Sequence, residues 1–163
     1  MTQAIVRERA RSIYGSVNQT YPADVRVTGD RYTSREFMEL EFQHVWPRVW
    51  NIGAWAAEMP STGDFVVHQL GRESILMVRQ SDGSVRAFHN VCPHRGNRLV
   101  HTEEGSVPEF SCTYHGWKFD LAGTVIDVQD PEDFPQGNPC GTVGLSEIPC
   151  EDWAGFIWYN MDV

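Results

Sequence analysis

The chain has 163 residues, of which 41% are hydrophobic, and its 22 acidic and 13 basic side chains give a formal net charge of −9. This length suits one domain with a sizeable core, and the negative charge argues against nucleic-acid binding, which needs basic side chains for phosphate contacts. No apolar run is long enough to cross a membrane and the start has no signal-peptide core, so we expect a cytoplasmic protein with no membrane partner.

Residues 1–48 predict an N-terminal arm followed by one helix. The arm, residues 1–32, is mostly polar, and its pattern permits a short helix over residues 4–13. Thr33 followed by Glu36 has the spacing of a capping box, so a longer helix should begin at Thr33 and end before Pro47. Its apolar residues surround more than half of the helix, which predicts packing on two sides. They are Phe37, Met38, Leu40, Phe42, Val45 and Trp46.

From Val49 onward the pattern changes to short strands separated by turn residues. Tight turns are indicated by Asp82-Gly83, Ala122-Gly123 and Ala154-Gly155. Many short strands at this spacing predict a mainly β domain over residues 49–163, an antiparallel sandwich or barrel. The expected strands are 50–53, 64–70, 74–79, 85–89, 109–111, 118–121, 124–128, 146–150 and 156–159.

Two loops within this region carry candidate metal ligands. The first reads Cys92-Pro93-His94-Arg95-Gly96 and the second reads Cys112-Thr113-Tyr114-His115-Gly116-Trp117. A structural zinc finger usually takes its cysteines from one element and its histidines from another, whereas each loop here provides one of each. This pairing suits two metal ions, one bound by both cysteines and the other by both histidines.

A zinc site is one alternative interpretation of the same residues. Another is a disulfide between Cys92 and Cys112 beside two incidental histidines. Gly96 and Gly116 argue against both alternatives, because glycine permits the positive φ and the close backbone approach that a loop around a sulfide needs.

The Cys-x-His and Cys-x-x-His pattern resembles the Rieske family. The resemblance implies a [2Fe-2S] cluster at the tips of two hairpin loops. It places Cys92 and Cys112 on the buried iron, and His94 and His115 on the outer iron. Around these ligands it places Arg95, Gly96, Tyr114, Gly116 and Trp117.

The neighbours of the ligands indicate which kind of Rieske protein the chain resembles. Rieske proteins of respiratory and photosynthetic complexes link the two loops by a disulfide, which Asn97 and Tyr114 cannot form here. Those proteins also place serine and tyrosine hydroxyls where this chain has Trp117 and Phe119. Fewer hydrogen bonds to sulfur stabilise the reduced cluster less, so we expect a potential near roughly −150 mV rather than +300 mV.

Four segments are similar to the α subunit of ring-hydroxylating oxygenases: residues 32–37, 45–50, 90–96 and 114–117. The resemblance implies that a reductase or ferredoxin delivers electrons to the cluster. They then reach a mononuclear non-haem iron, in the catalytic domain of the same or a neighbouring α subunit of a homotrimer, where O2 hydroxylates an aromatic substrate. We find no Asp followed by two closely spaced histidines for that iron, so the catalytic domain is expected to be absent from this chain.

Two other functions fit the same residues. One is a free ferredoxin-type electron carrier, and the other is a zinc-stabilised interaction module. Cys140 and Cys150 are expected to be plain thiols, and four histidines to be structural: His44, His68, His89 and His101. Two acidic clusters predict a solvated face or a docking surface for a basic redox partner. They are Glu103, Glu104 and Glu109, and Asp127, Asp130, Glu132 and Asp133.

Overall fold

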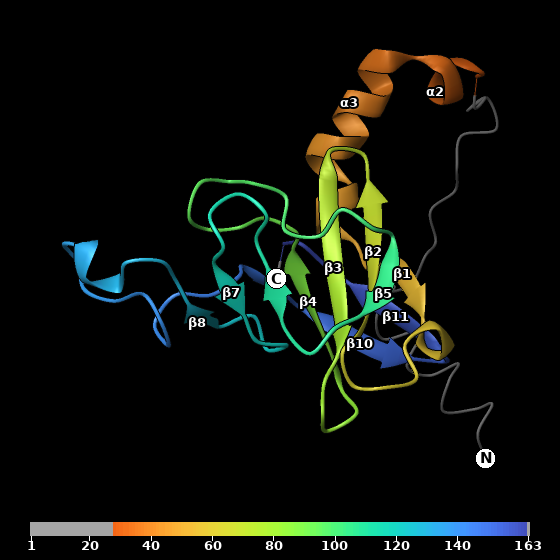
Figure 1. Cartoon of the computed structure of the whole chain (residues 1–163). Helices are drawn as coiled ribbons and strands as arrows, with labels where there is room; N and C mark the ends of the chain where they lie inside the picture. The colour runs from red at the N-terminus through yellow and green to blue at the C-terminus, as the bar shows by residue number, and fades with distance from the viewer. Residues whose placement is uncertain (1–27, 163) are drawn as a thin grey trace. The chain divides into compact units, whose positions relative to one another are not determined.

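A computed structural model describes residues 28–162, in which two α-helices precede eleven antiparallel strands (Figure 1). The described residues divide into two units between Phe37 and Met38. Most of the predicted arm, including the helix expected over residues 4–13, lies outside the described residues. No helix in the described range is both long and apolar enough to cross a membrane.

The helical region divides at Ser34 into α2, Asp30–Thr33, and α3, Arg35–His44. Ser34 is extended, with ψ of 125°, and its Oγ accepts a hydrogen bond from the Phe37 N–H at 3.2 Å. The helix cap is therefore Ser34, and the capping box predicted from Thr33 and Glu36 is wrong. The physical reason is that the Thr33 hydroxyl donates instead to the Gly29 carbonyl at 3.2 Å, within the preceding turn.

The expectation that the longer helix packs on two sides is also wrong. No residue of α3 is buried, and Met38 and Leu40 are about half exposed. Phe42 makes the clearest contact, because its ring lies where a Cβ at Gly71 would be. Gly71 stands in the β2–β3 turn with φ of +60°, so both the turn and the helix contact require glycine there.

Three antiparallel sheets make up the strand region. The five-stranded sheet has the order β5 (Glu104–Ser106), β2 (Asp64–Leu70), β3 (Glu73–Arg79), β4 (Val85–His89) and β9 (Glu147–Ile148). A three-stranded sheet has the order β1 (Asn51–Trp55), β11 (Phe156–Tyr159) and β10 (Cys150–Trp153). The third has the order β6 (Phe110–Ser111), β7 (Lys118–Phe119) and β8 (Val125–Asp127). Short 3₁₀ turns cover Trp46–Arg48, Ala56–Glu58 and Pro131–Asp133.

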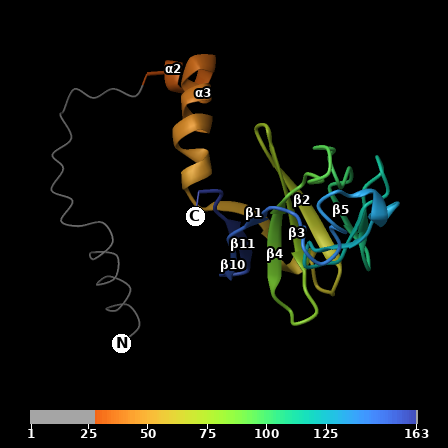
Figure 2. The same ribbon diagram turned by 90° about the vertical axis from the view of Figure 1, so that its left-hand side faces the viewer.

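Strand β3 lies between two hydrophobic cores because its side chains alternate. Leu76 and Val78 face a first core that contains Cys92 and Cys112, whereas Ile75 and Met77 face a second core shared with β1 and β11. All four β3 residues are fully buried. Figure 2 shows β10 and β11 on one side of the central strands and the loop-rich region on the other. The predicted antiparallel sandwich is thus confirmed.

Two strand predictions need correction. The strand expected over residues 146–150 is divided at Pro149, so that β9 joins the five-stranded sheet and β10 joins β11. Strand β5 was not expected, because an acidic, glycine-containing segment has low strand propensity. Pairing along β2, as between Phe65 and Gly105, supplies backbone hydrogen bonds that override this propensity. The predicted Ala154-Gly155 hairpin is present, with both φ values positive.

Candidate metal centre

The two ligand loops have nearly the same backbone. The first follows β4 and the second joins β6 to β7. In each loop the cysteine N–H and the glycine N–H close the turn, and each glycine has a positive φ, +71° at Gly96 and +70° at Gly116. The closing bonds are Cys92 N to Asn97 O at 2.8 Å and Gly96 N to Cys92 O at 3.0 Å, then Cys112 N to Trp117 O at 2.8 Å and Gly116 N to Cys112 O at 3.0 Å. The Cys-x-x-x-Gly spacing that the two loops share thus forms the same turn in both.

The two cysteine side chains face each other beneath these turns. Cys92 and Cys112 are each 2% exposed and belong to the first core. Both are free thiols, so the alternative of a disulfide between them is wrong. They lie close enough for each thiol to alter the pKa of the other.

Backbone N–H groups surround both sulfur atoms. Burial raises the pKa of the Cys92 thiol, although hydrogen bonds from the backbones of His94 and Arg95 oppose this. Burial also acts to raise the pKa of Cys112, but hydrogen bonds from the Tyr114 backbone and other donors outweigh it and lower that pKa. Donors of this kind stabilise a thiolate, which is the metal-binding form of cysteine.

The side chain of Asn97 connects the two loops. Its Nδ2 lies 3.8 Å from the sulfur of Cys112, and it is among the donors that lower the pKa of that thiol. The sequence analysis used Asn97 only to exclude a disulfide and missed this contact. No local pattern could have revealed it, because the donor and the sulfur belong to different loops.

The two histidine rings also lie side by side, with centroids 4.6 Å apart and an interplanar angle of 72°. His94 stacks on Trp117 at 4.7 Å and 6°, and its Nδ1 is buried without a hydrogen-bond partner. A buried polar nitrogen without a partner is costly, and a metal ion would satisfy it. Burial, followed by the positive charges of His115 and Arg95, lowers the pKa of His94 and favours the neutral, metal-binding imidazole.

Tyr114 covers the second histidine, since its ring centroid lies 3.8 Å from that of His115. The guanidinium carbon of Arg95 lies over the Tyr114 ring, 5.9 Å from its centroid. Tyr114 is 57% exposed, whereas Trp117 beside His94 is only 6% exposed. The histidine side of the site is therefore its solvent-facing side. Among residues 28–162 no three His, Cys, Asp or Glu side chains gather as ligands of a single metal ion.

Residues 49–140 match the family of the Rieske [2Fe-2S] domain. The chain belongs to this family. Biphenyl dioxygenase subunit alpha of Paraburkholderia xenovorans is 38% identical to it over 139 residues, which are 81% of this Rieske chain and 30% of the relative. The glycine betaine monooxygenase oxygenase subunit of Pseudomonas aeruginosa is 37% identical over 132 residues, with coverages of 80% and 30%. The chain thus spans 30% of the length of these two curated relatives.

Solved structures agree with this assignment. Naphthalene 1,2-dioxygenase with indole bound in its active site is similar with a TM-score of 0.71 and 35% identity, covering 78% of this chain and 29% of that one. The apo quaternary ammonium Rieske monooxygenase CntA has a TM-score of 0.74 and 29% identity, with coverages of 82% and 38%. The Rieske domain is therefore similar to oxygenases with different substrates.

Cys140 and Cys150 are free thiols, as expected. In this Rieske chain Cys140 packs on the first core, and Cys150 donates to the Val85 carbonyl at 3.1 Å. Burial raises the pKa of Cys150 to about 11. His89 Nδ1 lies 3.5 Å from a Glu73 carboxylate oxygen. His44 and His101 are exposed on the surface.

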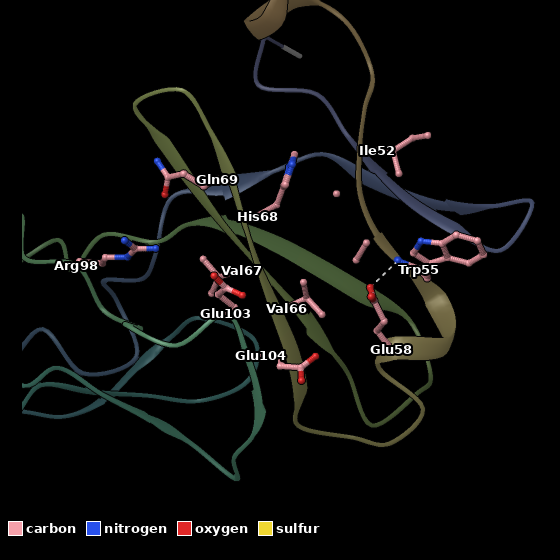
Figure 3. Close-up of a pocket in the computed structure, with 12 residues that line it drawn as sticks. Ile52, Trp55, Glu58, Val66, Val67, His68, Gln69, Arg98, Glu103 and Glu104 are labelled. Carbon is pink, nitrogen blue, oxygen red and sulfur yellow. Dashed lines mark hydrogen bonds between the residues drawn. The ribbon is translucent and has the colours of Figure 1, made fainter.

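A groove of about 820 Å³ is lined by residues of β1, β2 and β5, and none of the four candidate ligands lines it (Figure 3). His68 lies within it, and its Nδ1 is 3.0 Å from the Tyr159 hydroxyl. Burial lowers the pKa of His68, which favours the neutral ring, and its Nδ1 has a hydrogen-bond partner in the protein whereas Nδ1 of His94 has none. The labelled side chains of Glu103 and Glu104 also line the groove, which places part of the first acidic cluster along β5.

The single lysine connects the two acidic clusters. Lys118 Nζ lies 3.2 Å from a Glu109 oxygen and 3.8 Å from an Asp127 oxygen. These carboxylates raise the pKa of Lys118, with Glu109 contributing most. One member of each cluster is thus partly neutralised within the domain.

Proposed function

We propose that Cys92 and Cys112 hold one iron of a Rieske [2Fe-2S] cluster and that His94 and His115 hold the other. The observation that carries this proposal is the buried, partnerless Nδ1 of His94 beside a second histidine, above a pair of facing thiols. This donor set suits a cluster with two cysteine and two histidine ligands. When bound, the cluster accepts and releases one electron.

The residues of the chain prepare this site for electron transfer. Backbone N–H groups and the Asn97 amide stabilise negative charge on the sulfur atoms. The first core excludes water from the cysteine side, because both thiols are almost fully buried. The partly exposed histidines lie on the side that a redox partner can reach.

We infer that the chain is the electron-entry domain of a ring-hydroxylating oxygenase α subunit, with residues 49–163 as the Rieske domain and 1–48 as arm and helix. Similarity to oxygenase subunits supports this over a free carrier or a zinc module. A reductase or ferredoxin would supply electrons, and the catalytic domain of the same or a neighbouring α subunit in a homotrimer would receive them. None of the four cysteines forms a disulfide in the described residues, which fits a cytoplasmic location.

Aromatic hydroxylation is the reaction that we propose for the whole enzyme, on the similarity to biphenyl and naphthalene dioxygenases. The glycine betaine monooxygenase subunit, at 37% identity, provides the competing substrate class of alkylammonium compounds. Electron delivery would be the step common to both. A reading frame that continues past Val163 into an Asp and two closely spaced histidines would support the oxygenase, and a stop codon would support a free carrier.

Metal analysis of the purified chain tests the ligand assignment. We expect a reddish-brown protein with two irons and two acid-labile sulfides, and a Rieske-type electron paramagnetic resonance signal after reduction. Replacing His94 or His115 by Ala should remove the signal, whereas the matched change at the exposed His101 should not. A colourless protein with one zinc ion would refute the cluster.

A further inference from the structure

An aromatic pocket lies on the outer face of the sheet formed by β1, β11 and β10. Glu151 of β10 pairs directly across from Trp158 of β11, and Trp153 stands two positions further along β10. Because side chains of a strand alternate between faces, all three share one face. Trp50, which precedes β1, completes the lining of an open pocket of about 230 Å³. We call these four residues the tryptophan cage.

The rings of the cage are held in a defined arrangement. The Trp158 indole N–H donates to the Trp153 carbonyl at 3.2 Å, and the two ring centroids are 6.0 Å apart at 61°. Trp50 is nevertheless 43% exposed and Trp153 is 66% exposed. Indoles are mostly buried in folded proteins, so two exposed indoles beside a partly exposed third indicate a surface that binds a ligand or a partner.

The fourth member of the cage is an acid without a matching base. In the described part of the chain, Glu151 takes part in no ion pair, and no basic side chain lines the pocket. Arg48, the basic residue closest to Trp50 in sequence, lies 3.7 Å from Asp162 instead. The faces of indole rings attract cations, and a carboxylate beside them strengthens this attraction. The cage therefore has the chemistry of a cation site.

We propose that the tryptophan cage binds an arginine side chain of a partner polypeptide. Its volume of about 230 Å³ is smaller than the roughly 300 Å³ at which small-molecule sites begin, so it suits a terminal group rather than a whole ligand. A planar guanidinium can stack on an indole and also donate N–H groups to Glu151. A quaternary ammonium group has no N–H to donate to this carboxylate.

The surroundings of the cage favour a polypeptide as the source of the arginine. Ile52, which pairs across from Trp158, is 45% exposed, and Trp55 further along β1 is 60% exposed. Trp55 also contacts Phe156 of β11, with ring centroids 4.8 Å apart. The apolar surface thus continues beyond the pocket, as in interfaces where tryptophan and arginine dominate binding. The net charge of −9 further favours a basic partner.

A peptide titration tests this proposal on the full chain with its cluster. The probe is N-acetyl-Gly-Arg-Gly-amide, and the control peptide carries neutral citrulline in place of arginine. We expect the indole N–H resonances of Trp50, Trp153 and Trp158 to shift with the arginine peptide and not with the citrulline peptide. Changing Glu151→Gln or Trp153→Ala should weaken binding by about two- to fivefold.

Asp152→Asn is the matched control, because it removes the same charge from the next residue of β10, on the other face of the strand. Its affinity for the arginine peptide should equal that of the unchanged chain. Absent indole shifts, equal binding of citrulline, or an equal effect of Asp152→Asn would each overturn the proposal. So would tetramethylammonium chloride binding as tightly as the peptide. The visible spectrum of each sample reports the cluster separately, so failure here is distinguishable from failure of the cluster assignment.

Discussion

The two ligand loops have the same turn but different surroundings. In the first loop the histidine ring is stacked on buried Trp117, which belongs to the second loop. In the second loop the histidine is covered by exposed Tyr114, and the cysteine sulfur receives the Asn97 amide from the first loop. Each loop therefore completes the environment of the other. This comparison shows that local sequence specifies each turn, whereas the properties of the four ligands depend on contacts between the turns.

The largest expected effect comes from removing one of the two facing thiols, because each loop provides only one of them. Cys92→Ser or Cys112→Ser should abolish iron binding and unfold the region around the loops, because metal-binding energy contributes directly to folding at such a site. Iron content and circular dichroism would measure this, with Cys140→Ser as the matched control. A colourless Cys112→Ser domain with native strand content would show that the scaffold does not depend on its metal.

The aromatic partners of the two histidines should differ strongly in their contribution to stability. Trp117→Ala removes a buried ring and should lower the free energy of unfolding by about 3–5 kcal/mol. Tyr114→Ala removes an exposed ring and should cost less than about 1 kcal/mol. Denaturant unfolding of both variants would measure the difference. Equal losses would contradict the asymmetry between the loops.

The Asn97 contact should influence the reduction potential. We expect the potential of the unchanged chain to lie near roughly −150 mV, because Trp117 and Phe119 offer no hydroxyl to the sulfur atoms. Asn97→Ala removes a donor that stabilises negative charge, so it should lower the potential by about 20–60 mV. Voltammetry would measure both values, with Asn138→Ala as the control. A potential well above zero in the unchanged chain would refute the first expectation.

The smallest expected effect is on the pH dependence of stability and concerns His68, which lies outside the loops. Unlike Nδ1 of His94, its Nδ1 has a hydrogen-bond partner. Burial lowers the pKa of His68 below its usual 6.5, so the unfolded chain binds a proton there more readily than the folded chain does. Stability should therefore fall as the pH decreases from about 6.5 through the native pKa, and should level off below it. His68→Gln should make the melting temperature less dependent on pH between 7.5 and 5. His101→Gln should leave that dependence unchanged.

Much of the local structure followed from sequence patterns. The Asp82-Gly83 and Ala154-Gly155 turns, the antiparallel strands and the two glycine-containing loops were predicted because each depends on residues adjacent in the chain. The helix start was wrong by one residue, since Thr33 and Ser34 are both good caps and the Thr33 hydroxyl found a partner in the preceding turn. Strand β5 was missed because its pairing with β2 depends on a distant segment.

The four candidate ligands, their division between two loops and the resemblance to Rieske oxygenases could be recognised from the amino-acid sequence, because they depend on residue type and short spacing. Three contacts emerged only from the folded structure: Trp117 stacks on His94, Asn97 reaches the sulfur of Cys112, and three tryptophans converge around Glu151. The physical reason is that each of these contacts joins segments whose approach is set by strand pairing and core packing. No short pattern in the chain records which side chains the folded sheets bring together.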